Sequence, residues 1–219
     1  MFIVYLYIFI GQILIFKIKM DLLISLVQNF KNSEIKQVVN QRMQEFSNIP
    51  RNFNDLFREL AFCILTAGAS AELGIKTINH IGDVIFTGNE QDIQRKLKEV
   101  YRFHTIRAGY LFNARKAFKE LDLNHPKIRE HLVKNIKGIG IKEASHFLRN
   151  IGFSDYAIVD FHIVDILAEH GVIEKPKTLT PNKYLEIENV LRKLAEATNT
   201  SLGELDLYLW YKETGKVLK

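Results

Sequence analysis

Apolar residues recur at helical spacing along nearly the whole chain. Leu56, Leu60 and Ile64 would share one face of a helix, and similar patterns run from about His104 to Glu120 and from Ile141 to Asn150. Such a repeat is typical of amphipathic helices, whereas half-buried strands alternate at every second residue. No alternating stretch of useful length is present, so the sequence predicts an all-α fold.

Residues that favour helix ends accompany these patterns. The expected N-caps are Asn54 or Asp55, Ser70, Thr180 and Ser201, because their side chains can accept hydrogen bonds from the free amides of a first turn. Glu204 would complete a capping box with Ser201. Pro126 suits the first turn of a further helix, since its missing N–H would be unpaired there. Gly215 suits the end of the last helix, because glycine tolerates the left-handed conformation.

The segment before Met20 differs from the rest of the chain. Residues 1–16 are almost entirely apolar and are followed by Lys17 and Lys19. The segment is shorter than the roughly 20 residues that span a bilayer, and it lacks the basic start and cleavage site of a secretory signal. A short membrane anchor and upstream sequence translated by mistake are both open. Because an ordinary amphipathic pattern opens at Met20, we expect residues 1–19 to be an apolar extension outside the native fold.

Composition limits the classes of protein. The 219 residues are 47% hydrophobic and 25% charged, which is typical of a folded protein. A formal net charge of +5 permits nucleic-acid binding without requiring it. The single cysteine, Cys63, excludes an intramolecular disulfide and any site built from several cysteines. We expect it to be buried among its apolar neighbours, in a cytoplasmic protein that uses no metal and no cofactor.

A glycine-rich turn separates two of the predicted helices. The helix after Pro126 and the next helix are joined by about five residues that include Gly138 and Gly140, which predicts a helix–hairpin–helix at about 126–150. Glycine allows positive φ and close approach of another backbone, and the amides at a helix start favour a phosphate. The residues expected to bind a DNA phosphate are Lys137, Gly138, Ile139 and Gly140. A plain turn between packed helices is the alternative.

Lys142 follows this turn by two residues, and Asp160 lies 18 positions later, at the end of an apolar run. A lysine amine beside apolar residues at a helix start can act as a nucleophile and form a Schiff base. Taken singly, Lys142 could be an ordinary solvated lysine and Asp160 a plain N-cap. Together with the hairpin, their spacing predicts an amine and an acid that work on one sugar.

The segments Gly138-Ile139-Gly140-Ile141-Lys142 and Val159-Asp160-Phe161-His162 resemble the motifs Gly-Val-Gly-x-Lys and Val-Asp-x-His of the helix–hairpin–helix DNA glycosylase superfamily. The resemblance implies that Lys142 attacks the sugar C1′ and displaces a damaged base. Asp160 would stabilise charge on the sugar and help to deprotonate the amine. The Schiff base would then permit β-elimination, which nicks the strand 3′ to the lesion. Such enzymes flip their target nucleotide out of the duplex.

Within that superfamily, the chain is most similar to the second, archaeal-type family of 8-oxoguanine DNA glycosylase/AP lyases. The likeness rests on residues 59–67, Arg102-Phe103 with Arg107-Ala108, residues 135–150, and residues 204–208 with the tail 214–219. It covers nearly everything after Met20. The family has no metal cluster, and its C-terminal tail reaches into the base pocket. By this resemblance Phe103 and Trp210 stack on the flipped base, and Lys219 closes the pocket.

Trp210 has support from the helix pattern as well. Leu202, Leu205 and Leu209 would form the buried face of the last helix, which puts Trp210 on the shoulder of that face. A partly exposed tryptophan there could stack on a base. Simple packing roles for Phe103 and Trp210 are the alternatives.

We expect two helical lobes with the active site between them, formed by residues 20–52 with 166–219 and by residues 53–165. The expected partner is double-stranded DNA containing a damaged base, bound by a monomer without a stable protein partner or a membrane. Two alternatives are the same chemistry on another oxidised base, such as an oxidised pyrimidine, and a non-catalytic helix–hairpin–helix module. The sequence leaves open the preferred opposite base, activity on single strands, and a monovalent ion at the hairpin.

Overall fold

The computed structural model describes residues 2–219, with side chains described for Gly11 and for residues 14–219. Its helices are α1 (Phe2–Lys31), α2 (Ile35–Ser47), α3 (Phe53–Thr66), α4 (Ala71–Ile81), α5 (Val84–Thr87), α6 (Glu90–Lys98), α7 (His104–Lys119), α8 (Ile128–Asn135), α9 (Ile141–Asn150), α10 (Phe161–Glu169), α11 (Pro181–Thr198) and α12 (Leu202–Thr214). No strand occurs in residues 2–219. The all-α prediction is confirmed.

The chain forms two compact units. The terminal unit comprises the chain up to Met43 together with Ser154–Leu218, and the hairpin unit comprises Gln44–Phe153 together with Lys219. The boundaries between the two lobes were expected after residues 52 and 165, whereas the boundaries between the two units of the structure lie after residues 43 and 153. Asp160 therefore belongs to the terminal unit.

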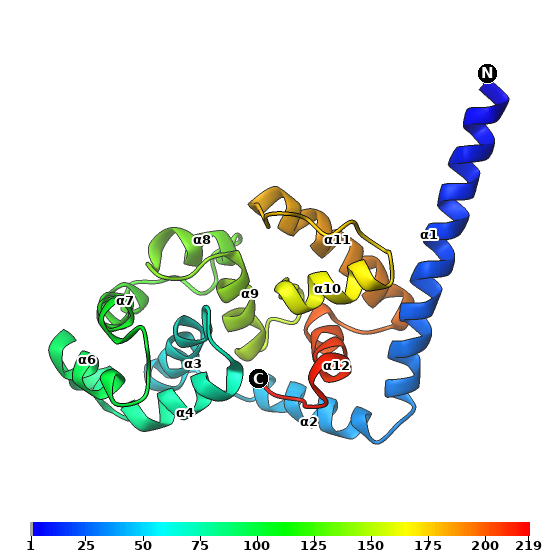
Figure 1. The fold of residues 1–219 in the computed structure, drawn as a ribbon. Coiled ribbons are helices and arrows are strands. Elements are labelled where there is room, and N and C mark those ends of the chain that lie inside the picture. Colours follow the sequence, from blue (N-terminus) through cyan, green and yellow to red (C-terminus); the bar gives the residue numbers. More distant parts are fainter. Residues whose placement is uncertain (1) are drawn as a thin grey trace. The chain divides into compact units, whose positions relative to one another are not determined.

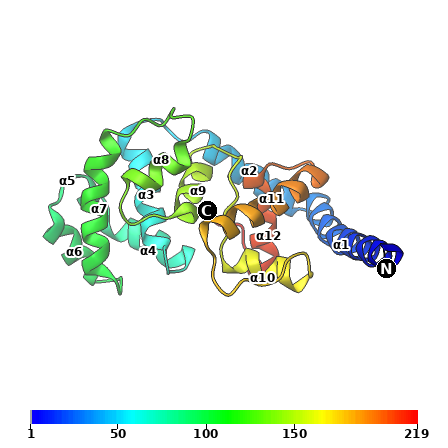
Figure 2. The ribbon, with the colours of Figure 1, turned by 90° about the horizontal axis from the view of Figure 1, so that it is seen from above.

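Helix α3 is the central helix of the hairpin unit in both views (Figure 1, Figure 2). It contacts α4, α7 and α9, and its residues from Glu59 to Thr66 are buried without interruption. A helix that is buried on all sides belongs to a core. Cys63 lies in this run and is fully buried, as the sequence predicts, and its burial raises the pKa of the thiol.

In the terminal unit, α1 packs against α11 and α12, and α10 packs against α12 (Figure 1). The helix α1 begins at Phe2, well before the predicted amphipathic start at Met20. Among the described side chains of α1, burial nevertheless begins there, since Met20, Leu23 and Val27 are buried while Ile18 is 54% exposed. The placement of residues 1–19 outside the native fold stays a prediction. Most apolar side chains of this segment lie outside the described residues. No helix over the described residues is long and apolar enough to cross a membrane.

Most helix ends lie where the sequence predicts them. The N-caps Ser70, Thr180 and Ser201 and the left-handed C-cap Gly215 are confirmed. The predicted cap of α3 was wrong. Asn52 caps this helix instead of Asn54 or Asp55, because its Oδ1 accepts a hydrogen bond from the Asp55 amide at 3.0 Å.

Two further details of the helix starts differ from the prediction. Pro126 precedes α8, and the Lys127 amide donates to Nδ1 of His125 at 3.0 Å in a turn ahead of the helix. At the start of α12 the Ser201 hydroxyl accepts from the Glu204 amide at 3.1 Å. The return bond to the Glu204 carboxylate is absent from the described hydrogen bonds, so only half of the predicted capping box forms.

Candidate active site

The helix–hairpin–helix consists of α8, the turn 136–140 and α9. Ile136 and Ile139 are buried and anchor the turn in the core of the hairpin unit. Gly138 has a φ of +99°, and a Cβ built on it would lie 2.4 Å from the ring of Tyr110. Its backbone conformation and the close ring therefore both require glycine.

The backbone amides of this turn differ in whether they have a hydrogen-bond partner. Those of Lys137, Gly138 and Ile139 donate no hydrogen bond to any described residue. The Gly140 amide donates to Oε2 of Glu143 at 3.0 Å, at the start of α9. Consecutive free amides form a concavity that suits an anion. The amides of Lys137, Gly138 and Ile139 can therefore donate to a phosphate, whereas the amide of Gly140 already donates to Glu143.

Lys142 lies in the first turn of α9 with its side chain 27% exposed. Its Nζ is 3.1 Å from Oε1 of Glu143, whose side chain is 14% exposed. His146 follows one helical turn later and is buried. Burial, assisted by the positive charges of Arg149, Lys142 and Lys219, lowers the pKa of His146 well below its usual range. The amine thus lies at the edge of a buried polar region.

Sequence reasoning missed Glu143 as a site residue. The signal that could have identified it is its position three residues after Gly140, because an acid at the third helical position commonly binds the free amide of the cap. Its pairing with Lys142 is an i, i+1 contact, which helical periodicity does not predict.

The C-terminal residue Lys219 is held in the hairpin unit. Its Nζ donates to Oε1 of Glu59 and lies 5.0 Å from the ring centre of Phe62. Glu59 is 8% exposed and also accepts a hydrogen bond from Nδ2 of Asn150 at 3.0 Å. The sequence did not single out Glu59 or Asn150. A carboxylate within an apolar helical run was the available signal, because a buried charge requires partners.

Phe103 immediately precedes α7 and is 41% exposed. The Arg102 guanidinium lies 5.1 Å from its ring centre, and the ring of Tyr101 meets it edge-on at 6.3 Å. Tyr101 is itself fixed, because its hydroxyl donates to the Leu65 carbonyl at 2.6 Å. Phe103 is therefore a partly exposed ring packed against Arg102 and Tyr101, and its exposed part can meet a stacking partner.

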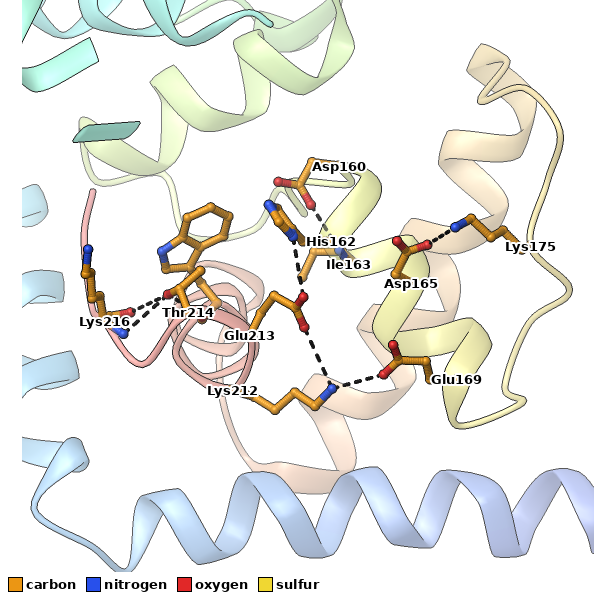
Figure 3. Close-up of polar contacts among 11 residues, drawn as sticks. Asp160, His162, Ile163, Asp165, Glu169, Lys175, Lys212, Glu213, Thr214 and Lys216 are labelled. Atoms are coloured by element: carbon orange, nitrogen blue, oxygen red, sulfur yellow. Dashed lines mark hydrogen bonds and ion pairs between the residues drawn. The ribbon is translucent and has the colours of Figure 1, made fainter. Parts of the chain in front are cut away.

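Asp160 is the N-cap of α10 in the terminal unit. Its Oδ1 accepts a hydrogen bond from the Ile163 amide at 3.0 Å (Figure 3). A cap of this kind uses one carboxylate oxygen, and Oδ2 makes no hydrogen bond or ion pair with any described residue. The carboxylate of Asp160 thus caps α10 through Oδ1 and keeps Oδ2 as an acceptor that a catalytic role could use.

The apolar run before Asp160 is fixed by residues of α11. The Tyr184 hydroxyl accepts from the Val159 amide at 3.1 Å and donates to the Ala157 carbonyl at 2.7 Å. Glu188 Oε2 accepts from the Ala157 amide at 3.1 Å. Sequence reasoning missed both side chains, because nothing in their local pattern distinguishes them from other residues of an amphipathic helix.

Trp210 lies on α12, beside the predicted buried face of Leu202, Leu205 and Leu209, which is confirmed at 1–3% exposure. The ring of His162 meets the indole edge-on at 5.0 Å and 88°. Nδ1 of His162 is 3.7 Å from Oε1 of Glu213, and Lys212 links that residue to Glu169 (Figure 3). The indole therefore packs edge-on against His162, which lies two residues after Asp160.

The predicted site residues divide between the two units. Lys142, the hairpin, Phe103 and Lys219 belong to the hairpin unit, while Asp160 and Trp210 belong to the terminal unit. Within the hairpin unit, Lys142 lies directly beside the turn. Phe103 and Lys219 share no partner in these contacts, because Phe103 contacts Tyr101 and Arg102 whereas Lys219 contacts Glu59.

Known proteins match this architecture and sequence. The model of the 8-oxoguanine DNA glycosylase family matches residues 39–200. The 8-oxoguanine DNA glycosylase/AP lyase of Korarchaeum cryptofilum is 46% identical over 207 residues, which cover 91% of this chain and 99% of the relative. The match extends over both units and includes the hairpin.

Two solved structures match as well. One is the 8-oxoguanine glycosylase/lyase of Methanocaldococcus jannaschii in complex with 15mer DNA containing 8-oxoguanine, at 48% identity and a TM-score of 0.84, covering 90% of this chain and 100% of that one. The other is the 8-oxoguanine DNA glycosylase of Thermotoga maritima, at 41% identity and a TM-score of 0.83, covering 91% and 100%. The resemblance found in the sequence is confirmed, and the chain belongs to the 8-oxoguanine DNA glycosylase family.

Proposed function

We propose that this chain is a bifunctional DNA glycosylase/AP lyase that removes 8-oxoguanine from double-stranded DNA. The observation that carries the proposal is the position of Lys142, in the first turn of α9 and directly beyond a hairpin with three free amides. Relatives that cover most of this chain are named 8-oxoguanine DNA glycosylase/AP lyase, and one of them has been solved with DNA containing 8-oxoguanine.

The hairpin binds a phosphate of the damaged strand. The free amides of Lys137, Gly138 and Ile139 donate to its oxygens, and the exposed side chain of Lys137 adds charge. Such contacts fix the register of the protein on DNA without reading its sequence. The target nucleotide leaves the base stack, because its glycosidic bond cannot be reached inside the duplex.

Lys142 then performs nucleophilic catalysis. Asp160 helps to deprotonate the amine by accepting a proton. The neutral Nζ then forms a bond to C1′ while the bond from C1′ to the base breaks, and the electron pair leaves with the base. Asp160 stabilises the positive charge that develops on the sugar. Opening of the sugar ring gives the Schiff base. Loss of a C2′ proton then breaks the C3′–O bond, which nicks the strand 3′ to the abasic site.

Three residues form the base pocket in this proposal. Phe103 and Trp210 stack on the flipped base, and Lys219 closes the pocket. The exposed ring of Phe103 and the half-buried indole of Trp210 support stacking roles. The hydrogen bond from the Lys219 amine to Glu59 supports an ordered C-terminus in the pocket.

The protein acts in this scheme as a monomer on duplex DNA, in the cytoplasm and without a metal cluster or other cofactor. The single buried cysteine supports a reducing compartment and provides no ligand set for a cluster. The family resemblance, in which one chain supplies the amine, the acid and the pocket, supports a monomer.

Borohydride trapping tests the proposed function. The protein is incubated with a duplex containing 8-oxoguanine, and reduction of the Schiff base is expected to leave a stable protein–DNA adduct. Lys142→Ala is expected to form no adduct while still binding the duplex. Lys137→Ala is the matched control, since it removes a lysine of the same hairpin but leaves the nucleophile, so it should weaken binding and keep trapping at saturating protein.

The same assay separates the alternatives. A non-catalytic module would bind the duplex and give no adduct from the unaltered chain, which would overturn the proposal. A base-release assay over a panel of lesions tests the substrate. Faster release of an oxidised pyrimidine than of 8-oxoguanine would contradict the assigned lesion but leave the lysine chemistry intact.

A further inference from the structure

Glu143 uses its two carboxylate oxygens on two different partners. Oε2 accepts the Gly140 amide at 3.0 Å, and Oε1 lies 3.1 Å from Nζ of Lys142. The side chain is only 14% exposed, so it is held against the protein rather than extended into solvent. One residue thus connects the last glycine of the hairpin to the amine of the neighbouring lysine.

We propose that Glu143 is a positioning residue that holds the Lys142 amine in register with the phosphate-binding hairpin. The inference rests on the proposed function, in which Lys142 is the nucleophile and the hairpin binds a phosphate of the same strand. The phosphate fixes the distance from the hairpin to the sugar. The carboxylate in turn fixes the distance from the hairpin to the amine.

A lysine needs such a partner because its side chain is long and flexible. Four rotatable bonds separate the Lys142 backbone from Nζ, and an unrestrained amine would sample many positions away from C1′. Attack on carbon requires close and aligned approach, and small misplacements slow it strongly. Glu143 is itself restrained by its bond to Gly140, so its oxygen offers the amine a fixed point.

Glutamate suits this role better than its nearest replacements. The Gly140 amide and the Lys142 amine are both donors, so two acceptor oxygens are needed. Glutamine has nearly the same shape but only one acceptor oxygen, and its NH₂ group would face one of the donors. Aspartate keeps two acceptor oxygens on a chain that is one methylene shorter. The two substitutions therefore separate acceptor chemistry from side-chain size.

The experiment measures single-turnover borohydride trapping on a duplex with a preformed abasic site, at saturating full-length protein. Glu143→Gln is expected to slow trapping by at least about tenfold, while the Kd for the duplex stays within about twofold. Glu143→Asp is expected to retain more of the rate than Glu143→Gln. Glu130→Gln, which neutralises an exposed carboxylate of α8 in the same unit, is the matched control and should trap at the unaltered rate.

The rank order of the variants separates positioning from packing. If Glu143 only fills space, glutamine would preserve the rate at least as well as aspartate, and that result would overturn the inference. A trapping rate for Glu143→Gln equal to that of the unaltered protein would overturn it as well. Absence of any adduct from the unaltered protein would instead overturn the proposed function, and this inference with it, so the two failures are distinguishable.

Discussion

The two units hold their chemical groups by contacts of different range. In the hairpin unit, the Lys142 amine and the Gly140 amide both contact the carboxylate of Glu143, within a single helical turn. In the terminal unit, the backbone that leads to Asp160 is fixed by Tyr184 and Glu188, which lie 25–31 positions further along the chain. The first arrangement joins residues that are close in the sequence, whereas the second exists only after α11 has packed.

Asp160→Asn gives the largest effect expected in the terminal unit and tests its acid. Asparagine caps a helix about as well as aspartate, so the bond to the Ile163 amide survives and only the charge is lost. Single-turnover excision of 8-oxoguanine should slow by about a hundredfold, in the range for a catalytic carboxylate, while the free energy of unfolding stays within about 0.5 kcal/mol.

Asp160→Ala completes this test, because alanine removes the cap as well as the charge. It should be slowed as much as Asp160→Asn and also lose about 1 kcal/mol of stability in urea unfolding. Unchanged excision by Asp160→Asn would leave Asp160 as a structural cap only, and the comparison between the units would then concern folding alone.

Tyr184→Phe tests the long-range fixation of the same segment. It leaves the Val159 amide and the Ala157 carbonyl buried without their hydroxyl partner, which should lower the free energy of unfolding by about 1–3 kcal/mol. Excision should also slow, because the segment that carries Asp160 is less well fixed. Tyr211→Phe is the matched control in the terminal unit, since that hydroxyl makes no hydrogen bond with any described residue. Equal stability losses in the two variants would contradict the assigned role.

Deletion of Lys219 tests the one group of the hairpin unit that comes from a distant part of the chain. The deletion removes the amine held by Glu59 and, in the proposed pocket, the residue that closes on the base. Excision of 8-oxoguanine should fall by about tenfold, which corresponds to about 1.4 kcal/mol of lost transition-state binding, whereas cleavage at a preformed abasic site should fall by less than about twofold. Equal losses in the two assays would argue against a pocket role.

This difference in range also explains what the sequence could predict. The helices, most caps and the hairpin follow from local patterns, so the all-α fold and the position of Lys142 were predictable. The hold of Glu59 on Lys219 spans 160 positions, and no local pattern encodes it. The cap of α3 was misassigned by two or three residues because Asn52, Asn54 and Asp55 are all good capping residues. Only the observed bond from the Asp55 amide to Asn52 decides among them.

Glu143 and the amide of Gly140 illustrate a second limit. The motif predicts that Gly140 offers its amide to DNA, yet the structure engages that amide with Glu143. A motif indicates which residues gather at a turn. It does not apportion their hydrogen bonds, because each bond depends on which acceptor lies closest in the folded chain.

The smallest expected effect is on stability in acid and concerns His146 of the hairpin unit. Burial lowers the pKa of His146 well below the usual 6.5. As the pH falls through 6.5, the unfolded chain therefore gains a proton that the folded chain does not, and the free energy of unfolding decreases. Urea unfolding at pH 7.5 and 5.5 should show a loss of up to about 1.4 kcal/mol from this group. His146→Gln should remove that part of the loss, whereas His104→Gln, on the less buried start of α7, should retain it. If both variants lose as much as the unaltered protein, His146 is protonated in the folded chain. The polar region beside Lys142 would then be open to water in the folded chain.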